Sequence, residues 1–410
     1  MGKAEINYKF ISGDGHVTEP TDLWLQRMDR RFRDRAPRVV SGSELPASKE
    51  FAGVPMSADT ENSDLFVIDG LVPLDFIDTI ATMANEKAAG TPIMGRSHNR
   101  AAEARAGATD PRARLADQDL DNLRAEVVYP NYAMYMFGAP DLEYRRECFR
   151  VYNDWLAEYC AVAPGRLLGV APQPLGGPIQ WAVAEAQRAA KLGLCSVLLP
   201  ADTPDRPWGD PYYVPLWEAL SDLQLPVSFH NSATEQFLRQ SPLDHPDRQT
   251  IKGLATQLGS YNIVDIKIGG QMRSLTGLIG SAVPARYPEL RFVIAEGGIG
   301  WVPSVIRLMD HWWEDHHHWL EPKLDEPPSF YHRRQFWNTF EDDRAGLLTR
   351  ELLNVDHLMW GSDYPHTEGT FPNSLDRVVK DFAGIPEETT RKILVDNAAS
   401  LYGKKIESRK

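Results

Sequence analysis

Eight short apolar segments, separated by longer stretches of helical periodicity, limit the fold of this chain more than any other feature of its sequence. The segments are rich in Val, Ile, Leu and Phe, and most of them close with Pro, Gly or Asp. Continuous apolar runs of this length are typical of strands that are buried on both faces of a parallel sheet. The predicted strands span residues 8–14, 125–130, 167–172, 195–200, 226–230, 291–297, 336–340 and 357–363.

Helical patterns lie between these segments, as a strand–helix repeat requires. One pattern spans 181–193 and ends at Gly193, and another spans 214–226 and ends at Pro226. Right-handed crossovers between parallel strands allow either an open doubly wound sheet or a closed barrel, and the spacing alone does not decide between them. No Gly-rich phosphate loop follows the first predicted strand, which disfavours an open sheet that binds nucleotides.

Two stretches interrupt the repeat. Residues 20–124 contain no clear strand pair, and within them we interpret 40–110 as a long, partly helical excursion over a barrel mouth or at a subunit contact. A second insertion, 231–290, contains a mixed apolar helix that would wall the site or pair subunits. Because loops of this length in compact domains are usually functional, we expect both insertions to bear on function.

Charge and hydropathy exclude several classes of partner. The formal net charge of -13 argues against a nucleic-acid partner, because nothing offsets repulsion by phosphates. The chain has no run of 18 apolar residues and begins without an apolar signal segment, so we expect no membrane span. The cysteines are odd in number and widely spaced, at Cys148, Cys160 and Cys195. This pattern indicates reduced thiols, as in a cytoplasmic protein, and we expect them to serve as small core residues.

Residues that commonly ligate metals stand at the ends of three predicted strands. The first strand carries Asp14 and His16, which are two residues apart and therefore point to the same side. The fifth predicted strand ends at His230 and the eighth at Asp363. A single strand-end histidine is more often a hydrogen-bonded core residue. Two imidazoles and two carboxylates together, however, suit a divalent cation that does hydrolytic or Lewis-acid work.

A run of three histidines at 316–318 also looks like a short metal-binding tract. It lies beside Trp312, Trp313 and Trp319. We therefore interpret it as the aromatic end of a helix, without a metal role.

At these motifs the chain resembles a known family. It is similar to the amidohydrolase-related branch that contains aminocarboxymuconate-semialdehyde decarboxylase and gamma-resorcylate decarboxylase, and within it to the longer class of about 400 residues. The resemblance implies a (β/α)8 TIM barrel that occupies residues 1–410 as a single metal-dependent domain, with the insertions 40–110 and 231–290. The matching motifs are GDGHVTEP at 13–20, GATDPRARLADQDLDNLRAEVVYPN at 107–131, GRLLGVAPQPL at 165–175, VSFHNS at 227–232, AEGGIGWVPSVIRLMD at 295–310, MWGSDYPHTEGTFPNS at 359–374 and KILVDNAASLYG at 392–403.

The resemblance places the metal ligands on Asp14, His16, His230 and Asp363, with two departures from the family pattern. The decarboxylases often begin with His-x-His or Glu-x-His, whereas this chain begins with a carboxylate at Asp14, which makes the site harder and more negative. They also carry a catalytic histidine after the sixth strand, where this chain has Glu296. A carboxylate there could act as a general base or ligate a second cation, which weakens direct transfer of the decarboxylase mechanism.

Several neighbouring residues are candidates for supporting roles. A second metal, or contacts to the first ligands, would involve Glu19, Glu296 and His366, although Glu19 could equally bond a neighbouring loop. Substrate binding would involve Arg273, His366 and Glu368, where Arg273 could clamp a carboxylate or form a surface ion pair.

These residues predict a metal-dependent hydrolase or non-oxidative decarboxylase that acts on a small carboxylated or cyclic organic molecule. Glu296, Asp363 and His230 are the predicted catalytic residues, and Zn²⁺ or Mn²⁺ is the expected cofactor, with iron also compatible with the ligands. Two alternatives stay open: a non-haem iron or di-iron monooxygenase on the same barrel, and a barrel that binds without catalysis. Family members commonly form dimers, so a cytoplasmic homodimer is expected.

Overall fold

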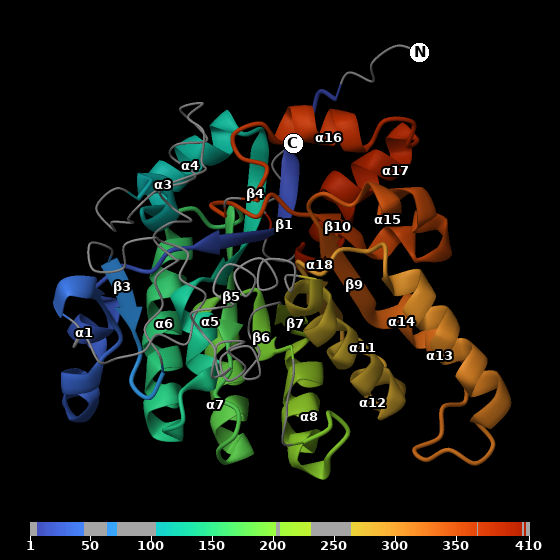
Figure 1. Ribbon diagram of the computed structural model, residues 1–410, viewed down its shortest axis with the longest axis horizontal. Coiled ribbons are helices and arrows are strands. Elements are labelled where there is room, and N and C mark those ends of the chain that lie inside the picture. The colour runs from blue at the N-terminus through green and yellow to red at the C-terminus, as the bar shows by residue number, and fades with distance from the viewer. Residues whose placement is uncertain are drawn as a thin grey trace, which may run out of the picture.

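The computed structural model describes residues 6–44, 64–71, 104–201, 206–230, 264–366, 368–403 and 406, and the statements below concern these residues. A single sheet of eight parallel strands forms the centre of the molecule (Figure 1), and all eight strands predicted from the sequence are present. The strands, in their order across the sheet, are β1 (Phe10–Val17), β4 (Leu123–Pro130), β5 (Leu167–Pro172), β6 (Ser196–Pro200), β7 (Val227–His230), β8 (Phe292–Ala295), β9 (Phe336–Phe340) and β10 (Leu358–Trp360).

The first and last strands meet, which makes the sheet a barrel rather than an open sheet. The backbone N–H of Asp363, just after β10, donates to the carbonyl of Asp14 on β1 at 3.1 Å. The rings of Phe10 and Trp360 pack edge to face, with 5.6 Å between their centroids. A Cβ on Gly361 would lie 2.6 Å from the Cβ of Asp14, so this close approach requires glycine. The (β/α)8 prediction is therefore confirmed.

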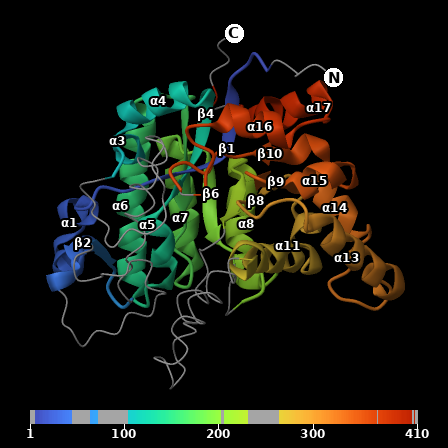
Figure 2. The ribbon, with the colours of Figure 1, turned by 45° about the horizontal axis from the view of Figure 1, so that its top comes forward.

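Helices lie on both sides of the strands, with α4 (Pro111–Leu120) and α6 (Leu142–Ala161) on one side and α13 (Val302–His316), α14 (Pro328–Gln335) and α15 (Arg344–Thr349) on the other (Figure 2). The predicted helix at 181–193 is α7, and its cap Gly193 adopts a φ of 87°, as the stop signal indicates. The longer helices are α4 (Pro111–Leu120), α6 (Leu142–Ala161), α7 (Ile179–Leu192), α8 (Val214–Leu223), α11 (Gly270–Gly280), α13 (Val302–His316), α14 (Pro328–Gln335) and α16 (Ser374–Asp381). The shorter helices are α1 (Leu23–Arg27), α3 (Ala106–Thr109), α5 (Tyr132–Tyr135), α12 (Val283–Arg286), α15 (Arg344–Thr349), α17 (Glu387–Arg391) and α18 (Asn397–Tyr402).

The expectation that residues 20–124 lack a strand pair is wrong. Strands β2 (Arg38–Ser41) and β3 (Asp64–Val67) pair in an antiparallel manner, and the ring of Phe66 stacks on that of Tyr132 with 4.0 Å between the centroids. Each strand has only four residues, too few for a period-two pattern to stand out, and packing against α5 (Tyr132–Tyr135) stabilises them instead. The rest of the predicted excursion, 45–63 and 72–103, lies outside the described residues.

The second insertion, 231–290, carries a helix that is fixed to the barrel rim. Residues 231–263 lie outside the described part of the chain, and Asp265–Gly269 then form one π-helical turn that leads into α11. The side-chain amide of Gln271 donates to the carbonyl of Phe229 at 3.1 Å and to that of Ala295. Because Phe229 precedes the last residue of β7 and Ala295 is the last residue of β8, α11 is anchored beside the mouth of the barrel. Whether this helix walls the site or pairs subunits stays a prediction.

Features distant from the mouth also bear on earlier expectations. The three cysteines are free thiols, and Cys148 and Cys195 are buried. Residues 316–318 stand at the end of α13, where His317 Nδ1 lies 2.9 Å from the carbonyl of Trp313, as expected for an aromatic helix end. None of the helices in the described ranges is long and apolar enough to cross a membrane.

Candidate metal centre

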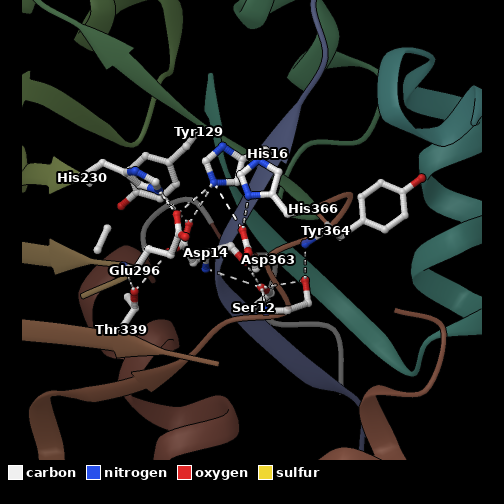
Figure 3. Close-up of polar contacts among 12 residues, drawn as sticks. Ser12, Asp14, His16, Tyr129, His230, Glu296, Thr339, Asp363, Tyr364 and His366 are labelled. Atoms are coloured by element: carbon white, nitrogen blue, oxygen red, sulfur yellow. Dashed lines mark hydrogen bonds and ion pairs between the residues drawn. The ribbon is translucent and has the colours of Figure 1, made fainter. Parts of the chain in front are cut away.

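Five side chains from four strand ends converge at the mouth of the barrel (Figure 3). Asp14 and His16 come from β1 and His230 is the last residue of β7, whereas Glu296 and Asp363 follow β8 and β10. Nε2 of His230 lies 3.2 Å from Glu296 Oε2 and 3.5 Å from Asp14 Oδ1. Nε2 of His16 lies 3.5 Å from Asp363 Oδ1 and 3.6 Å from Glu296 Oε2. We call these five residues the mouth cluster.

The ligand atoms of the mouth cluster are buried and oriented toward one another. His16 Nδ1 lies 3.1 Å from the carbonyl of Pro130, which directs Nε2 into the cluster. Within the described residues, neither His16 Nε2 nor Asp14 Oδ1 has a hydrogen-bond partner, although both atoms are fully buried. Buried polar atoms normally find such partners. These atoms and their chemistry therefore fit a divalent cation.

Together with His366, the mouth cluster offers two overlapping ligand groups. One group combines His16, Glu296, Asp363 and His366, and the other combines His16 with Asp14 and His230; within each group the ligand atoms lie within 4.8 Å of one another. Both groups share His16, whose Nε2 has a single lone pair to donate. The simplest interpretation is therefore one cation position that is bordered by both groups.

Backbone strain and a threonine fix the carboxylates. Glu296 and Asp363 have φ values of 55° and 54°, a region that side-chain-bearing residues rarely adopt at a cost of about 1–3 kcal/mol each. The hydroxyl of Thr339 on β9 donates to Asp14 Oδ2 at 3.2 Å and accepts from the backbone N–H of Glu296 at 2.7 Å. Nothing in its sequence context singles out Thr339, because its role depends on two strands that are distant in the chain.

A second buried cluster lies next to Gly15 of β1 and explains why the Asp-Gly-His motif has glycine at its centre. A Cβ on Gly15 would lie 2.1 Å from Glu126 Oε1, so only glycine fits there. Arg114 donates to Glu126 Oε2 and to the carbonyl of His16, both at 2.8 Å, and so ties this cluster to the metal ligands. Its members, which we call the seam cluster, are Ser12, Arg114, Gln118, Glu126 and Ser362.

The loop after β10 adds a further imidazole. His366 Nδ1 lies 2.8 Å from Asp363 Oδ1, and His366 Nε2 lies 2.9 Å from the side-chain oxygen of Asn131. Its ring stacks on that of His16, with 4.0 Å between the centroids. His366 is thus oriented from both sides and presents one nitrogen to the mouth cluster.

The carboxyl groups of the mouth shift one another's pKa values. Burial alone would raise the pKa of Glu296, but Lys267 and the nearby imidazoles hold that pKa well below its usual value. Burial and then the charge of Glu296 raise the pKa of Asp363 well above its usual value. Burial also raises the pKa of the neighbouring Glu341. Three carboxyl groups this close do not ionise together without a nearby cation.

Comparison with known proteins identifies the family of this chain. The family model described as amidohydrolase matches residues 83–404, well over half of the chain. The chain belongs to the amidohydrolase family. It is 25% identical to gamma-resorcylate decarboxylase from Polaromonas sp. over 278 residues, which cover 62% of this chain and 76% of that protein.

Solved structures agree with the barrel. An amidohydrolase from Mycobacterium avium subsp. paratuberculosis superposes with a TM-score of 0.69 at 20% identity, covering 97% of this chain and 100% of the other. A 5-carboxyvanillate decarboxylase from Novosphingobium aromaticivorans, crystallised with manganese, gives a TM-score of 0.62 at 17% identity and covers 97% of each chain. Family, relatives and cluster together identify a metal-dependent enzyme, a hydrolase or carboxy-lyase with a divalent metal cofactor.

Not every sequence candidate of this amidohydrolase reaches the mouth cluster. Both carboxylate oxygens of Glu19 accept backbone N–H groups, from Tyr132 at 2.9 Å and from Ala133 at 3.0 Å, so Glu19 bonds the start of α5 and lies outside both ligand groups. Arg273 is exposed on α11 and lies outside the mouth cluster. Glu19 is therefore poorly placed as a metal ligand, whereas substrate binding by Arg273 stays a prediction.

A lysine that the sequence analysis did not single out reaches the mouth cluster. Lys267, in the π-helical turn before α11, places Nζ 3.0 Å from Glu296 Oε1 and 3.4 Å from Glu368 Oε1. Glu368, a predicted substrate-binding residue, is thus at the outer side of the mouth. Lys267 lies in an apolar, irregular stretch whose register relative to the barrel no local pattern could reveal.

Proposed function

We propose that this amidohydrolase removes CO₂ without oxidation from a small aromatic carboxylic acid. The observation that carries the proposal is the mouth cluster, in which two imidazoles and several carboxylates surround one cation position beside aromatic side chains. The ring of Tyr129 lies 4.8 Å from that of His230 and 6.1 Å from that of His16. Relatives named as decarboxylases of gamma-resorcylate and 5-carboxyvanillate support this substrate class.

The proposed metal ligands are Asp14, His16, His230 and Asp363. A divalent cation held there would bind an anionic substrate and withdraw electron density from it. Manganese is our first choice because it is present in a structural relative, and zinc and iron remain compatible with these ligands.

The side chains of the mouth supply the protons. In decarboxylation the bond between the ring carbon and the carboxylate breaks, CO₂ leaves, and a proton takes its place on the carbon. Glu296 and Asp363 are the proposed groups that hold and deliver this proton, since both carboxyls face the cation position. His230 orients Glu296 from a distance of 3.2 Å.

Hydrolysis is the second candidate, and one observation favours it. Glu296 stands where the decarboxylases of the family carry a histidine, and Lys267 keeps its carboxylate ionised. An ionised carboxylate beside a metal position suits a general base that takes a proton from an attacking water. An ester or amide of an aromatic acid would then be the substrate.

A product analysis separates the candidates. The purified protein, loaded with Mn²⁺, is incubated under nitrogen with 2,6-dihydroxybenzoate, 5-carboxyvanillate and related hydroxybenzoates in D₂O. We expect release of CO₂ and one deuterium on the product ring. Hydrolysis of the corresponding esters or anilides without CO₂ release from any free acid would establish the second candidate. Turnover only with dioxygen and a reductant would establish the iron oxygenase instead.

Assembly and location complete the proposal. We propose a cytoplasmic homodimer, in which the excursion 40–110 shapes the substrate pocket of its own subunit or of the neighbouring one. Sedimentation as a monomer at micromolar concentration, together with unchanged kinetics after excision of the excursion, would contradict this.

A further inference from the structure

Lys267 links the mouth cluster to the solvent side of the barrel. Its side chain is 24% exposed, between the buried Glu296 and the exposed Glu368. The ammonium group thus lies between two carboxylates, one facing the cation position and one facing outward.

The position of Lys267 is set by the barrel itself. Gln271, one turn further along the same helix, donates to the carbonyls of Phe229 and Ala295. These two residues directly precede His230 and Glu296. The helix that carries Lys267 is therefore fixed to the two strand ends that supply the cluster, so the distance of Lys267 from Glu296 follows from the fold.

The two oxygens of Glu296 face different partners. Oε2 lies 3.2 Å from His230 Nε2 and 3.6 Å from His16 Nε2, which places it toward the cation position. Oε1 lies 3.0 Å from Lys267 Nζ. A carboxylate binds a divalent cation through one oxygen or through both. A charge-assisted hydrogen bond on Oε1 competes with the second mode.

We propose that Lys267 is a positioning residue that restricts Glu296 to a single oxygen at the metal position. Glu296 then cannot chelate the cation, and it stays available for proton transfer. This inference rests on the proposed function, in which Glu296 handles protons. Lys267, which lies in the second insertion, would then help to position an active-site carboxylate.

Metal affinity measures this restriction directly, without turnover. Mn²⁺ binding is titrated by competition with a fluorescent chelator for the wild type, Lys267→Met and Lys267→Arg. We expect Lys267→Met to bind Mn²⁺ about tenfold more tightly, because the second oxygen is released. Lys267→Arg retains a donor for Oε1 and should stay within about threefold of the wild type. Lys191→Met makes the same change on the exposed face of α7 and should leave affinity unchanged.

A double-mutant cycle separates this role from simple loss of a positive charge. If Lys267 acts through Glu296, the Lys267→Met change should alter Mn²⁺ affinity by less than about twofold in a Glu296→Gln background. If the charge acts through space, the tenfold gain should persist there. Visible absorption of the Co²⁺-loaded proteins gives a second readout, since a released oxygen that joins the metal raises its coordination number and weakens the absorption.

The outcomes are distinct. Unchanged Mn²⁺ affinity of Lys267→Met, or a gain that persists without the Glu296 carboxylate, overturns the inference. Thermal unfolding of each metal-free variant identifies any failure to fold, in which case Lys267→Gln is tested in its place. Absence of CO₂ release from every hydroxybenzoate would overturn the proposed function alone, because metal binding is measured independently of the reaction.

Discussion

The mouth cluster and the seam cluster are both buried, both polar and both built on β1, yet the hydrogen bonding of their carboxylates differs. In the seam cluster, Glu126 accepts from Arg114 and Gln118 through one oxygen and from Ser362 through the other. In the mouth cluster, among the described residues, Asp14 Oδ1 and His16 Nε2 have no hydrogen-bond partner.

This difference distinguishes a structural polar cluster from a binding site. A buried carboxylate with bonded oxygens stabilises the packing around it, whereas buried carboxylates and imidazoles without such bonds cost free energy unless a ligand joins them. The seam cluster should therefore matter most for folding, and the mouth cluster for metal binding and turnover.

The largest expected effect is loss of turnover on removal of a metal ligand. His230→Ala and Asp363→Asn should reduce activity to the uncatalysed rate and lower the bound metal, because each removes a ligand atom from the cluster. The circular dichroism spectrum should stay that of the wild type, since the barrel core does not depend on mouth residues. His317→Ala, on the exposed tract of α13, is the matched control and should change neither quantity. Retained turnover with an unchanged spectrum would refute the ligand roles.

A smaller loss is expected when a proton carrier is replaced without loss of a ligand. Glu296→Gln should lower turnover by roughly 10²–10⁴-fold with metal content unchanged, because the amide keeps one oxygen for the cation position but cannot exchange a proton. Steady-state rates and elemental analysis of the same preparation check both parts. A fall from two equivalents of iron toward one, with activity that needs dioxygen, would show instead that Glu296 is a ligand of a di-iron site.

The seam cluster should show the opposite pattern, in stability rather than in chemistry. Arg114→Met leaves the buried Glu126 carboxylate without its cation and should lower the free energy of unfolding by about 3–5 kcal/mol. The double variant Arg114→Met, Glu126→Gln removes both charges and should recover much of this loss. Urea denaturation of metal-free proteins measures both. A single variant as stable as the wild type would mean that the seam cluster does not stabilise the barrel.

The sequence predicted the barrel and the mouth cluster for a common physical reason. Strands buried on both faces are continuous apolar runs, and residues at their ends share one rim of the barrel, so His230 and Asp363 could be placed together although 133 positions separate them. The short strands β2 and β3 were missed because their pairing depends on packing against α5 rather than on a local pattern.

Residues whose role depends on three-dimensional register could not be predicted in the same way. Lys267 reaches Glu296 only because Gln271 fixes α11 to β7 and β8, and Thr339 joins Asp14 to Glu296 only because β9 lies between β8 and β10. Conversely, Glu19 lies within a motif that the resemblance matched, but each of its carboxylate oxygens accepts a hydrogen bond from a backbone N–H group. Sequence proximity to a motif is therefore weaker information than the strand end on which a residue lies.

The smallest effect concerns a buried imidazole that has a structural role, in contrast to His16 and His230. His332 on α14 lies 3.3 Å from the side-chain amide of Asn338 and stacks on Phe336, and burial lowers its pKa to about 3. In the unfolded chain the pKa of His332 is 6.5, so below that pH the unfolded state binds a proton that the folded state does not bind. Stability from this residue is thus fully present above pH 6.5 and is lost as the pH falls toward 3.

At pH 5 this linkage should cost the metal-free protein about 2 kcal/mol of its free energy of unfolding relative to pH 7.5. His332→Gln retains an acceptor for Asn338 but does not titrate, so its loss over the same interval should be smaller by that amount. Urea denaturation at the two pH values, with chelator present so that metal release does not contribute, measures the difference. Equal losses in both proteins would mean that the imidazole of His332 takes up a proton without unfolding. His332 would then resemble the mouth histidines in being open to a ligand, and a buried imidazole with a hydrogen-bond partner could no longer be classed as structural on that ground.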